Sequence, residues 1–164
     1  PYHRRALSPL TREARLESNL QDAENLRNGY DRPIGDADNG ARGPKGSFVT
    51  YTLDTPQWVE AVRLVLDSDL NRETLPEREM KLNRGMRHNI RLCWEKSHMP
   101  TTVVKDLDVM WTLEDGSQEM QSLRGNHQRL VWIPCRQKVA AVTIRLLDTW
   151  GSEDCHLFAV DLME

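Results

Sequence analysis

The feature that most constrains this chain is a period-two alternation of apolar and polar residues, which recurs about eight times after residue 47. Gly, Pro, Asn and Asp separate the alternating segments at intervals near ten residues. Period two places every second side chain on the same face, as in a strand that buries one face. No strand–helix–strand rhythm accompanies these segments. The pattern therefore predicts an all-β fold, an antiparallel β-sandwich or jelly roll of two sheets.

The segment at residues 58–66 organises the others, because it ends in a charged cluster. Val62, Leu64 and Leu66 share one face of this predicted strand, and the string D-S-D-L-N-R follows at residues 67–72. A buried strand thus delivers acidic and basic side chains to one end of the fold. The remaining segments lie at 48–53, 88–95, 103–113, 118–123, 129–133, 139–147 and 156–163. We expect a core that contains Val62, Leu64, Ile90, Leu92, Val109, Trp111, Trp132, Ile144 and Val160.

The residues before the first strand predict a helix and a loop. Ser8 followed by Pro9 is a good helix start, with Ser as the cap and Pro at the first helical position, and it predicts a short helix over residues 9–18. Residues 28–47 are dense in Gly and Pro, which is typical of a loop. A loop of this length in a compact domain is usually functional or mobile.

Length and composition suit one globular domain. The chain has 164 residues, of which 38% are hydrophobic and 29% charged, and we assign an N-terminal linker with the helix to 1–27 and a β-sandwich domain to 28–164. The net charge is −3 with both signs mixed along the chain, so we expect no nucleic-acid partner. No apolar run approaches the roughly 20 residues that cross a bilayer, so we expect no membrane insertion. The start at Pro1 is interpreted as that of a fragment, which leaves the compartment open with a periplasmic or extracellular location favoured.

The residues that usually carry catalysis or bind zinc form no motif. The five histidines are scattered, and no Gly-rich dinucleotide fingerprint follows a strand. The three cysteines are widely spaced and predict buried thiols, with a single disulfide as the alternative. We therefore expect a chain that is not an enzyme by itself and holds no cofactor.

The string after the organising strand copies the opening of an EF-hand loop. Asp67, Asp69 and Asn71 match its first three ligands, but Arg72 replaces the required Gly and Arg78 replaces the required bidentate Glu. An EF-hand is therefore rejected. A different calcium site would draw on Asp31, Asp67, Asp69 and Asn71, whereas the favoured interpretation is an Asx-rich turn.

Polar and aromatic residues at predicted loops and strand ends are candidates for ligand binding. An aromatic face can stack on the apolar face of a sugar ring while Asp, Asn and Arg bind its hydroxyl groups. Trp94, Trp111 and Trp132 lie on alternating strands and are interpreted as core residues. The candidate ligand-binding residues are Tyr30, Arg32, Asp67, Asp69, Arg72, Arg129 and Trp150.

Three strings resemble a known family: N-G-Y-D-R-P at residues 28–33, V-R-L-V-L-D-S-D-L-N-R at 62–72 and G-N-H-Q-R at 125–129. Together they resemble the C-terminal β-sandwich of bacterial FAD-dependent oxidoreductase-like proteins. That sandwich is similar to the galactose-binding-like, discoidin-type jelly roll of many carbohydrate-binding modules. The resemblance implies a parent protein that holds FAD and an upstream domain of the same polypeptide as the partner.

Two functions therefore compete for the same residues. In the favoured one, the chain is a non-catalytic accessory module that docks onto or stabilises the parent's catalytic domain, and Asp67, Arg72 and Arg129 clamp the 28–46 loop. In the alternative, the chain is a carbohydrate-binding module that uses the end loops of the sandwich. The favoured interpretation leaves at most weak sugar contact for Tyr30 and Trp150.

Overall fold

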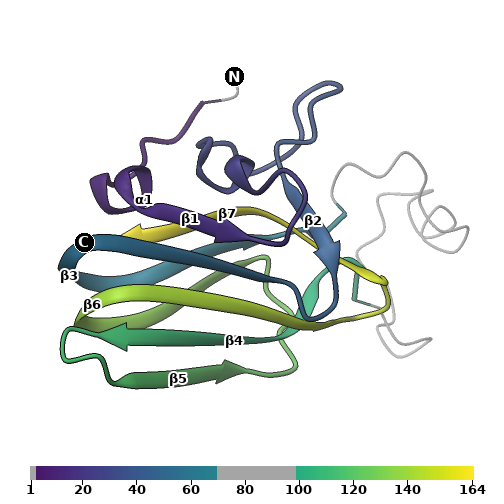
Figure 1. Cartoon of the computed structure of the whole chain (residues 1–164). Coiled ribbons are helices and arrows are strands. Elements are labelled where there is room, and N and C mark those ends of the chain that lie inside the picture. The colour runs from purple at the N-terminus through teal and green to yellow at the C-terminus, as the bar shows by residue number, and fades with distance from the viewer. Residues whose placement is uncertain (1–2, 70–98) are drawn as a thin grey trace, which may run out of the picture.

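The fold is an antiparallel β-sandwich, as the alternation predicted, seen in a computed structural model that describes residues 3–69 and 99–164 (Figure 1). The described elements are α1 (Pro9–Glu13), β1 (Arg15–Ser18), the 3-10 helix η1 (Ala23–Arg27), β2 (Ala41–Pro44), β3 (Phe48–Leu66), β4 (Val104–Leu113), β5 (Gln118–Leu123), β6 (Leu130–Thr149) and β7 (Asp154–Met163). The predicted strand at 88–95, with Ile90, Leu92 and Trp94, lies outside the described residues.

The two predicted sheets are one continuous sheet among the described strands. Its strand order is β2-β7-β3-β6-β4-β5, and β1 also pairs with β3. The long strands β3 and β6 curve strongly, so that each runs through both layers of the sandwich (Figure 1). The sequence predicted a turn at residues 54–56, but β3 continues past Pro56. The register of β3 with β6 shifts between Thr52 and Gln57, so the residues between them are not paired with β6. Pro56 lies in this unpaired stretch, where its lack of a backbone N–H costs no hydrogen bond between the strands.

Strand pairing gives the sandwich two distinct ends. The curvature of β3, the 114–117 hairpin and residues 136–138 lie together at one end, which we call the bend end. At the opposite end, the loop end, backbone hydrogen bonds join the chain after β3 to β7 and join the 124–129 turn to the start of β4. Strand ends that are far apart in sequence, including Asp67 and Arg129, therefore meet at the loop end.

The core lies between the two layers and, among the described residues, matches the prediction with one exception. Val62, Leu64, Val109, Trp111, Ile144 and Val160 are all fully buried. Trp132 was predicted to be a core residue, and this is wrong, because its exposed fraction is 52%. It lies opposite Arg63 on the outer face of β6, while its neighbours Val131 and Ile133 point into the core.

The N-terminal segment adds to the sandwich. Ser8 caps α1 through a 3.1 Å hydrogen bond from the Thr11 backbone N–H, as predicted, but the helix ends at Glu13 rather than at residue 18. The following residues pair with β3 as β1 instead. Thr11 is fully buried, and its hydroxyl accepts a 2.8 Å hydrogen bond from the backbone N–H of Leu162, which ties α1 to the last strand.

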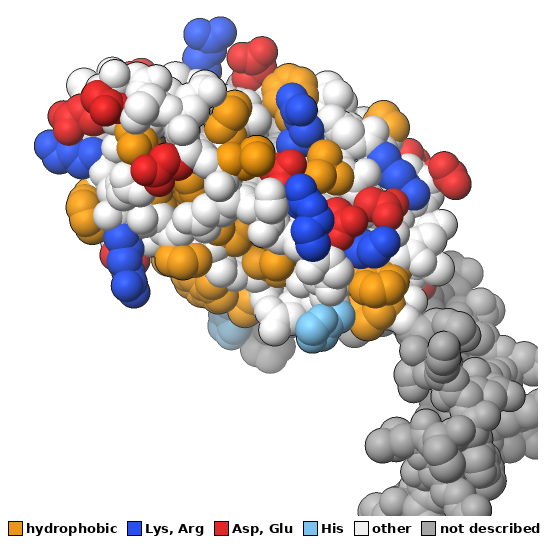
Figure 2. Space-filling model, turned by 90° about the horizontal axis from the view of Figure 1, so that it is seen from below, with side chains coloured by type: hydrophobic (Ala, Val, Ile, Leu, Met, Phe, Trp, Pro, Cys, Tyr) orange, Lys and Arg blue, Asp and Glu red, His pale blue; other side chains and the backbone are white. Residues whose placement is uncertain are grey.

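Two further sequence expectations concern the surface and the thiols. Basic and acidic side chains are interspersed on the face that Figure 2 shows. Arg124, for example, lies 2.6 Å from Asp108. Within the described ranges, no helix is long and apolar enough to span a membrane. Cys135 and Cys155 are free thiols, and burial raises the pKa of Cys155 to about 11.

Candidate functional site

The loop end contains a cavity of about 550 Å³ whose walls come from five separate parts of the chain. The 31–40 loop, β2, the chain after β3, the residue before β6 and the last strand β7 all contribute. Its lining residues are Arg32, Pro33, Gly35, Arg42, Asp67, Ser68, Asp69, Arg129, His156 and Phe158. Four of the seven candidate ligand-binding residues, Arg32, Asp67, Asp69 and Arg129, therefore line one cavity.

A β-bulge in β7 brings two of these residues to the cavity. Val65 pairs with Ala159 and Leu66 with Leu157, so Phe158 is an extra residue in the β7 strand. A bulge of this kind changes which face the neighbouring side chains occupy. Leu157 and Val160 consequently both enter the main core, while Phe158 packs outside it with Val65 and Ala159. The ring of His156 meets that of Phe158 edge to face at 4.6 Å.

Asp67 forms the Asx turn that the sequence favoured over a calcium site. One carboxylate oxygen accepts a 2.8 Å hydrogen bond from the Asp69 backbone N–H, and the other lies 2.9 Å from Nδ1 of His156. Burial opposes the ionised form of this carboxyl, but the hydrogen bonds from His156 and Asp69 outweigh that effect and lower the pKa of Asp67 below its ordinary value of 3.8. His156 is 2% exposed, and its Nε2 lies 3.2 Å from Oδ1 of Asp38 in the loop.

The lowered pKa of Asp67 predicts how stability depends on pH. Because the folded state binds this proton less tightly than the unfolded state, Asp67 stabilises the fold above its unfolded pKa. That stabilisation should be lost as the pH falls from about 4 through the lower folded pKa. Asp67→Asn should therefore reduce the free energy of unfolding at pH 7 and flatten its decrease below pH 4, as measured by urea unfolding across pH. If the free energy of unfolding fell below pH 4 as steeply in Asp67→Asn as in the unmodified chain, this assignment would be contradicted.

Arg129 connects the turn before β6 to the 28–46 loop. Its guanidinium donates a hydrogen bond to the backbone carbonyl of Asp31 and lies 5.7 Å from the ring centroid of Phe158. Desolvation by burial lowers the pKa of Arg129. Within the part of the chain that the structure describes, no carboxylate lies within 4.0 Å of this guanidinium, and its Nε–H has no hydrogen-bond partner. The predicted contact between Arg129 and the loop is present, and it is made to an uncharged backbone carbonyl.

Two of the other predicted residues, Tyr30 and Trp150, do not line this cavity. Tyr30 lines a smaller neighbouring cavity of about 100 Å³ that shares Arg32. Trp150 is 39% exposed, and its indole N–H donates to the backbone carbonyl of Asn126 at 2.5 Å. Arg72 lies outside the described residues, as does Asn71. The G-N-H-Q-R string has a structural role, because the buried Asn126 side chain holds the turn through hydrogen bonds to Val104 and to Gln128.

The carboxylates proposed for calcium do not form a metal-binding group among the described residues. Asp31 pairs with Arg63 and lies 3.7 Å from Arg5, whereas Asp67 is engaged by His156. In residues 3–69 and 99–164, no group of three or more His, Cys, Asp or Glu side chains is placed to hold a metal ion. Calcium binding remains the less favoured alternative to the Asx-rich turn.

Sequence reasoning missed His156, Phe158, Arg42 and Ser68 as lining residues. The last strand reads C-H-L-F-A-V-D-L-M, which is apolar on both faces, so its alternation does not reveal the bulge. His156, a polar residue two positions before Phe158 in this mostly apolar strand, is the sequence signal that could have pointed to the cavity lining. Ser68 lay inside the D-S-D-L-N-R string and was overlooked between two carboxylates.

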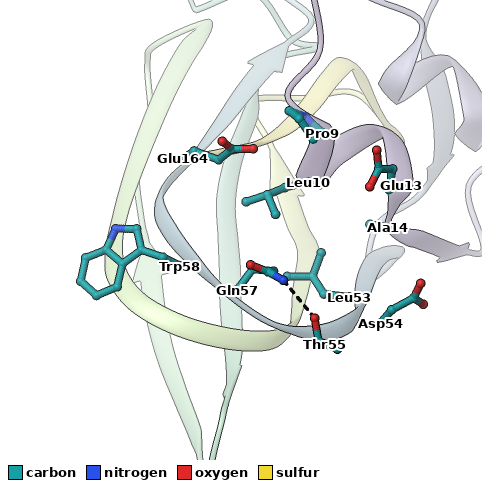
Figure 3. Close-up of a pocket in the computed structure, with 10 residues that line it drawn as sticks. All are labelled: Pro9, Leu10, Glu13, Ala14, Leu53, Asp54, Thr55, Gln57, Trp58 and Glu164. Carbon is teal, nitrogen blue, oxygen red and sulfur yellow. Dashed lines mark hydrogen bonds between the residues drawn. The ribbon is translucent and has the colours of Figure 1, made fainter.

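A second cavity, of about 660 Å³, lies at the bend end (Figure 3). Trp58, which is 52% exposed, forms one side, and Leu10 and Leu53 form the floor. The only hydrogen bond between the side chains drawn there joins Gln57 to Thr55 at 2.9 Å. None of the candidate ligand-binding residues that the structure describes lines it.

Comparison with known proteins identifies the fold. No protein-family model matches the sequence, and no curated protein matches it. Solved structures are similar in fold, and two of them are a family 32 carbohydrate-binding module of Streptococcus pneumoniae EndoD and a second family 32 module bound to GalNAc. The first has a TM-score of 0.63 at 14% identity and covers 96% of this chain and 99% of its own. The second has a TM-score of 0.63 at 10% identity and covers 92% of this chain and 98% of its own.

A fucose-binding module of Streptococcus pneumoniae, SpX-3, is equally similar, with a TM-score of 0.63 at 10% identity over 96% of this chain and 98% of its own. The chain thus shares the β-sandwich fold of these sugar-binding modules. The comparisons give no support to the flavin-dependent parent that the sequence resemblance implied.

Proposed function

We propose that this chain is a non-catalytic carbohydrate-binding module and that its sugar site is the loop-end cavity. This was the alternative interpretation of the sequence, and the fold similarity to sugar-binding modules supports it better than the docking role. A parent catalytic domain to which the module is joined remains a further part of the proposal.

The observation that carries the proposal is a cavity at the loop end whose lining combines hydrogen-bond donors and acceptors. Arg32, Arg42 and Arg129 contribute N–H donors to this lining, and Asp67 and Asp69 contribute carboxylate acceptors. A sugar offers hydroxyl groups that such side chains can bind.

The test is a glycan array probed with four purified proteins: the unmodified chain, Arg129→Ala, Trp150→Ala and Trp58→Ala. We expect the unmodified chain to bind at least one glycan and Arg129→Ala to lose that binding. Trp58→Ala, which alters only the bend-end cavity, should bind as the unmodified chain does, and Trp150→Ala should change binding little. Thermal unfolding of each protein identifies any loss that comes from misfolding. If Trp58→Ala lost binding and Arg129→Ala kept it, the sugar site would be at the bend end.

A further inference from the structure

We propose that the bend-end cavity docks a partner protein through a short extended segment in which lysine or arginine side chains flank an apolar one. This interaction is separate from sugar binding at the loop end and does not depend on it. It is argued from an exposed aromatic ring beside an apolar floor, from carboxylates without cationic partners, and from a stretch of β3 without a paired strand.

The apolar part of the cavity suits the central side chain of such a segment. Trp58 is 52% exposed, and Leu10 and Leu53 beside it form the floor of a cavity of about 660 Å³ (Figure 3). A large aromatic side chain exposed next to apolar neighbours is typical of the centre of a protein–protein interface. An apolar side chain of the partner would pack on Leu10 and Leu53, with Trp58 as one wall.

The charged side chains that line this cavity are acidic. Glu13, Asp54 and Glu164 line it, and no lysine or arginine of the described residues does. Glu13 lies 3.1 Å from Arg12, whereas the side chains of Asp54 and Glu164 have no ion pair within residues 3–69 and 99–164. In Figure 3, Glu164 lies on the same side of the floor as Trp58, and Asp54 lies on the other side. Basic side chains on both flanks of the partner segment complement this arrangement, and one of them can contact the indole face.

Two basic side chains elsewhere at the bend end are already matched. Arg136 lies 2.9 Å from Glu60, and Lys138 lies 3.7 Å from Glu114. Neither Arg136 nor Lys138 lines the cavity. The negative charge of the cavity therefore remains available to a partner.

The main chain of β3 at the cavity favours a peptide over other cationic ligands. Among the described strands, residues 53–56 pair with neither β6 nor β1, because both pairings stop at Thr52 and the pairing with β6 resumes further along β3. Leu53, Asp54 and Thr55 in this stretch line the cavity. Their backbone groups can hydrogen-bond to an extended segment, as an unpaired strand edge does.

The experiment is a peptide array probed with the labelled, purified chain. Each peptide carries a central Leu, Phe or Val that is flanked on both sides by Lys, Arg, Gln or Glu. We expect binding to peptides with Lys or Arg flanks, weaker binding with Gln flanks and none with Glu flanks. Binding should weaken as NaCl rises, since salt screens the attraction. Equal binding to basic, neutral and acidic flanks, or binding to no peptide, would overturn the inference and leave the proposed function intact.

Matched variants assign the binding to the bend end, with affinity for the tightest basic peptide measured by fluorescence polarisation. Trp58→Ala should weaken this affinity about tenfold, and Asp54→Asn about threefold, as an exposed ion pair contributes. Trp132→Ala, which removes an equally exposed tryptophan from the outer face of β6, should leave the affinity unchanged, as should Glu153→Gln, which alters an exposed carboxylate outside the cavity. Unchanged affinity in both cavity variants would overturn the inference. Asp54→Asn alters an exposed side chain, so the test does not depend on whether Trp58→Ala folds.

Two further outcomes would identify a different occupant and overturn the inference. Analytical ultracentrifugation of the unmodified chain and Trp58→Ala tests for a second copy, which a dimer dissociated by the substitution would reveal. The glycan array described above tests for a sugar, which a loss of glycan binding in correctly folded Trp58→Ala would reveal.

Discussion

Arg63→Met should lower the free energy of unfolding by about 3 kcal/mol, the lower part of the range for breaking a buried ion pair. Arg63 lies on the outer face of β3, with its side chain 11% exposed, 2.9 Å from Asp161 and paired also with Asp31. The carboxylate of Asp161 is fully buried, and Arg5, 2.6 Å away, would remain as its one cationic partner among the described residues. Methionine keeps most of the packing of the side chain, so the measured loss reports the charge.

Urea unfolding of matched variants checks this result. Arg136→Met removes an arginine that is 72% exposed and pairs with Glu60, and it should cost less than about 1 kcal/mol, as exposed pairs do. The double variant Arg63→Met/Asp161→Leu removes both buried charges and should be more stable than Arg63→Met alone. A double variant less stable than Arg63→Met would show that the buried carboxylate is not the source of the cost.

Gly40→Ala is the second large expected effect, a loss of about 2–3 kcal/mol from overpacking together with a lost buried hydrogen bond. A Cβ at this position would lie 2.2 Å from Nε2 of His156, closer than any contact that proteins tolerate. His156 is buried and cannot swing into solvent, so it must leave its position against Asp67. The backbone of Gly40 does not have a left-handed φ, and the cost is therefore steric.

A double-mutant cycle separates crowding from other causes. His156→Ala alone leaves the buried Asp67 carboxylate without its partner and should be destabilising. In Gly40→Ala/His156→Ala the added methyl group has room, so the combined cost should be smaller than the sum of the two single costs. Strictly additive costs would mean that Ala at position 40 acts through something other than the imidazole.

The fold was largely predictable because most strands bury one face. In β3, Val62, Leu64 and Leu66 lie on one face at period two, and the structure buries all three. The prediction failed where both faces are apolar. Residues 130–133 read L-V-W-I, so alternation alone cannot say which of Val131 and Trp132 points inward.

The candidate site was predictable only in part, for a related reason. Asp67 and Arg129 are charged residues at predicted strand ends, which indicated that they lie at the same end of the sandwich, and both line the loop-end cavity. The contribution of β7 depends on a bulge, which is a property of strand pairing and leaves no local pattern in the sequence. The pairing of Arg63 with Asp161 likewise joins residues 98 positions apart, which a single sequence does not reveal.

The passage of β3 and β6 through both layers has a consequence for how the molecule unfolds. In a sandwich of two separate sheets, one sheet can in principle loosen while the other persists. Here the two layers share the same two strands, with Val65 paired to Leu130 in one layer and Val49 to Ile144 in the other. Separating the layers requires straightening both strands and opening the core along their whole length. We therefore expect the sandwich to behave as a single cooperative unit, in which hydrogen-exchange protection is shared between the two layers.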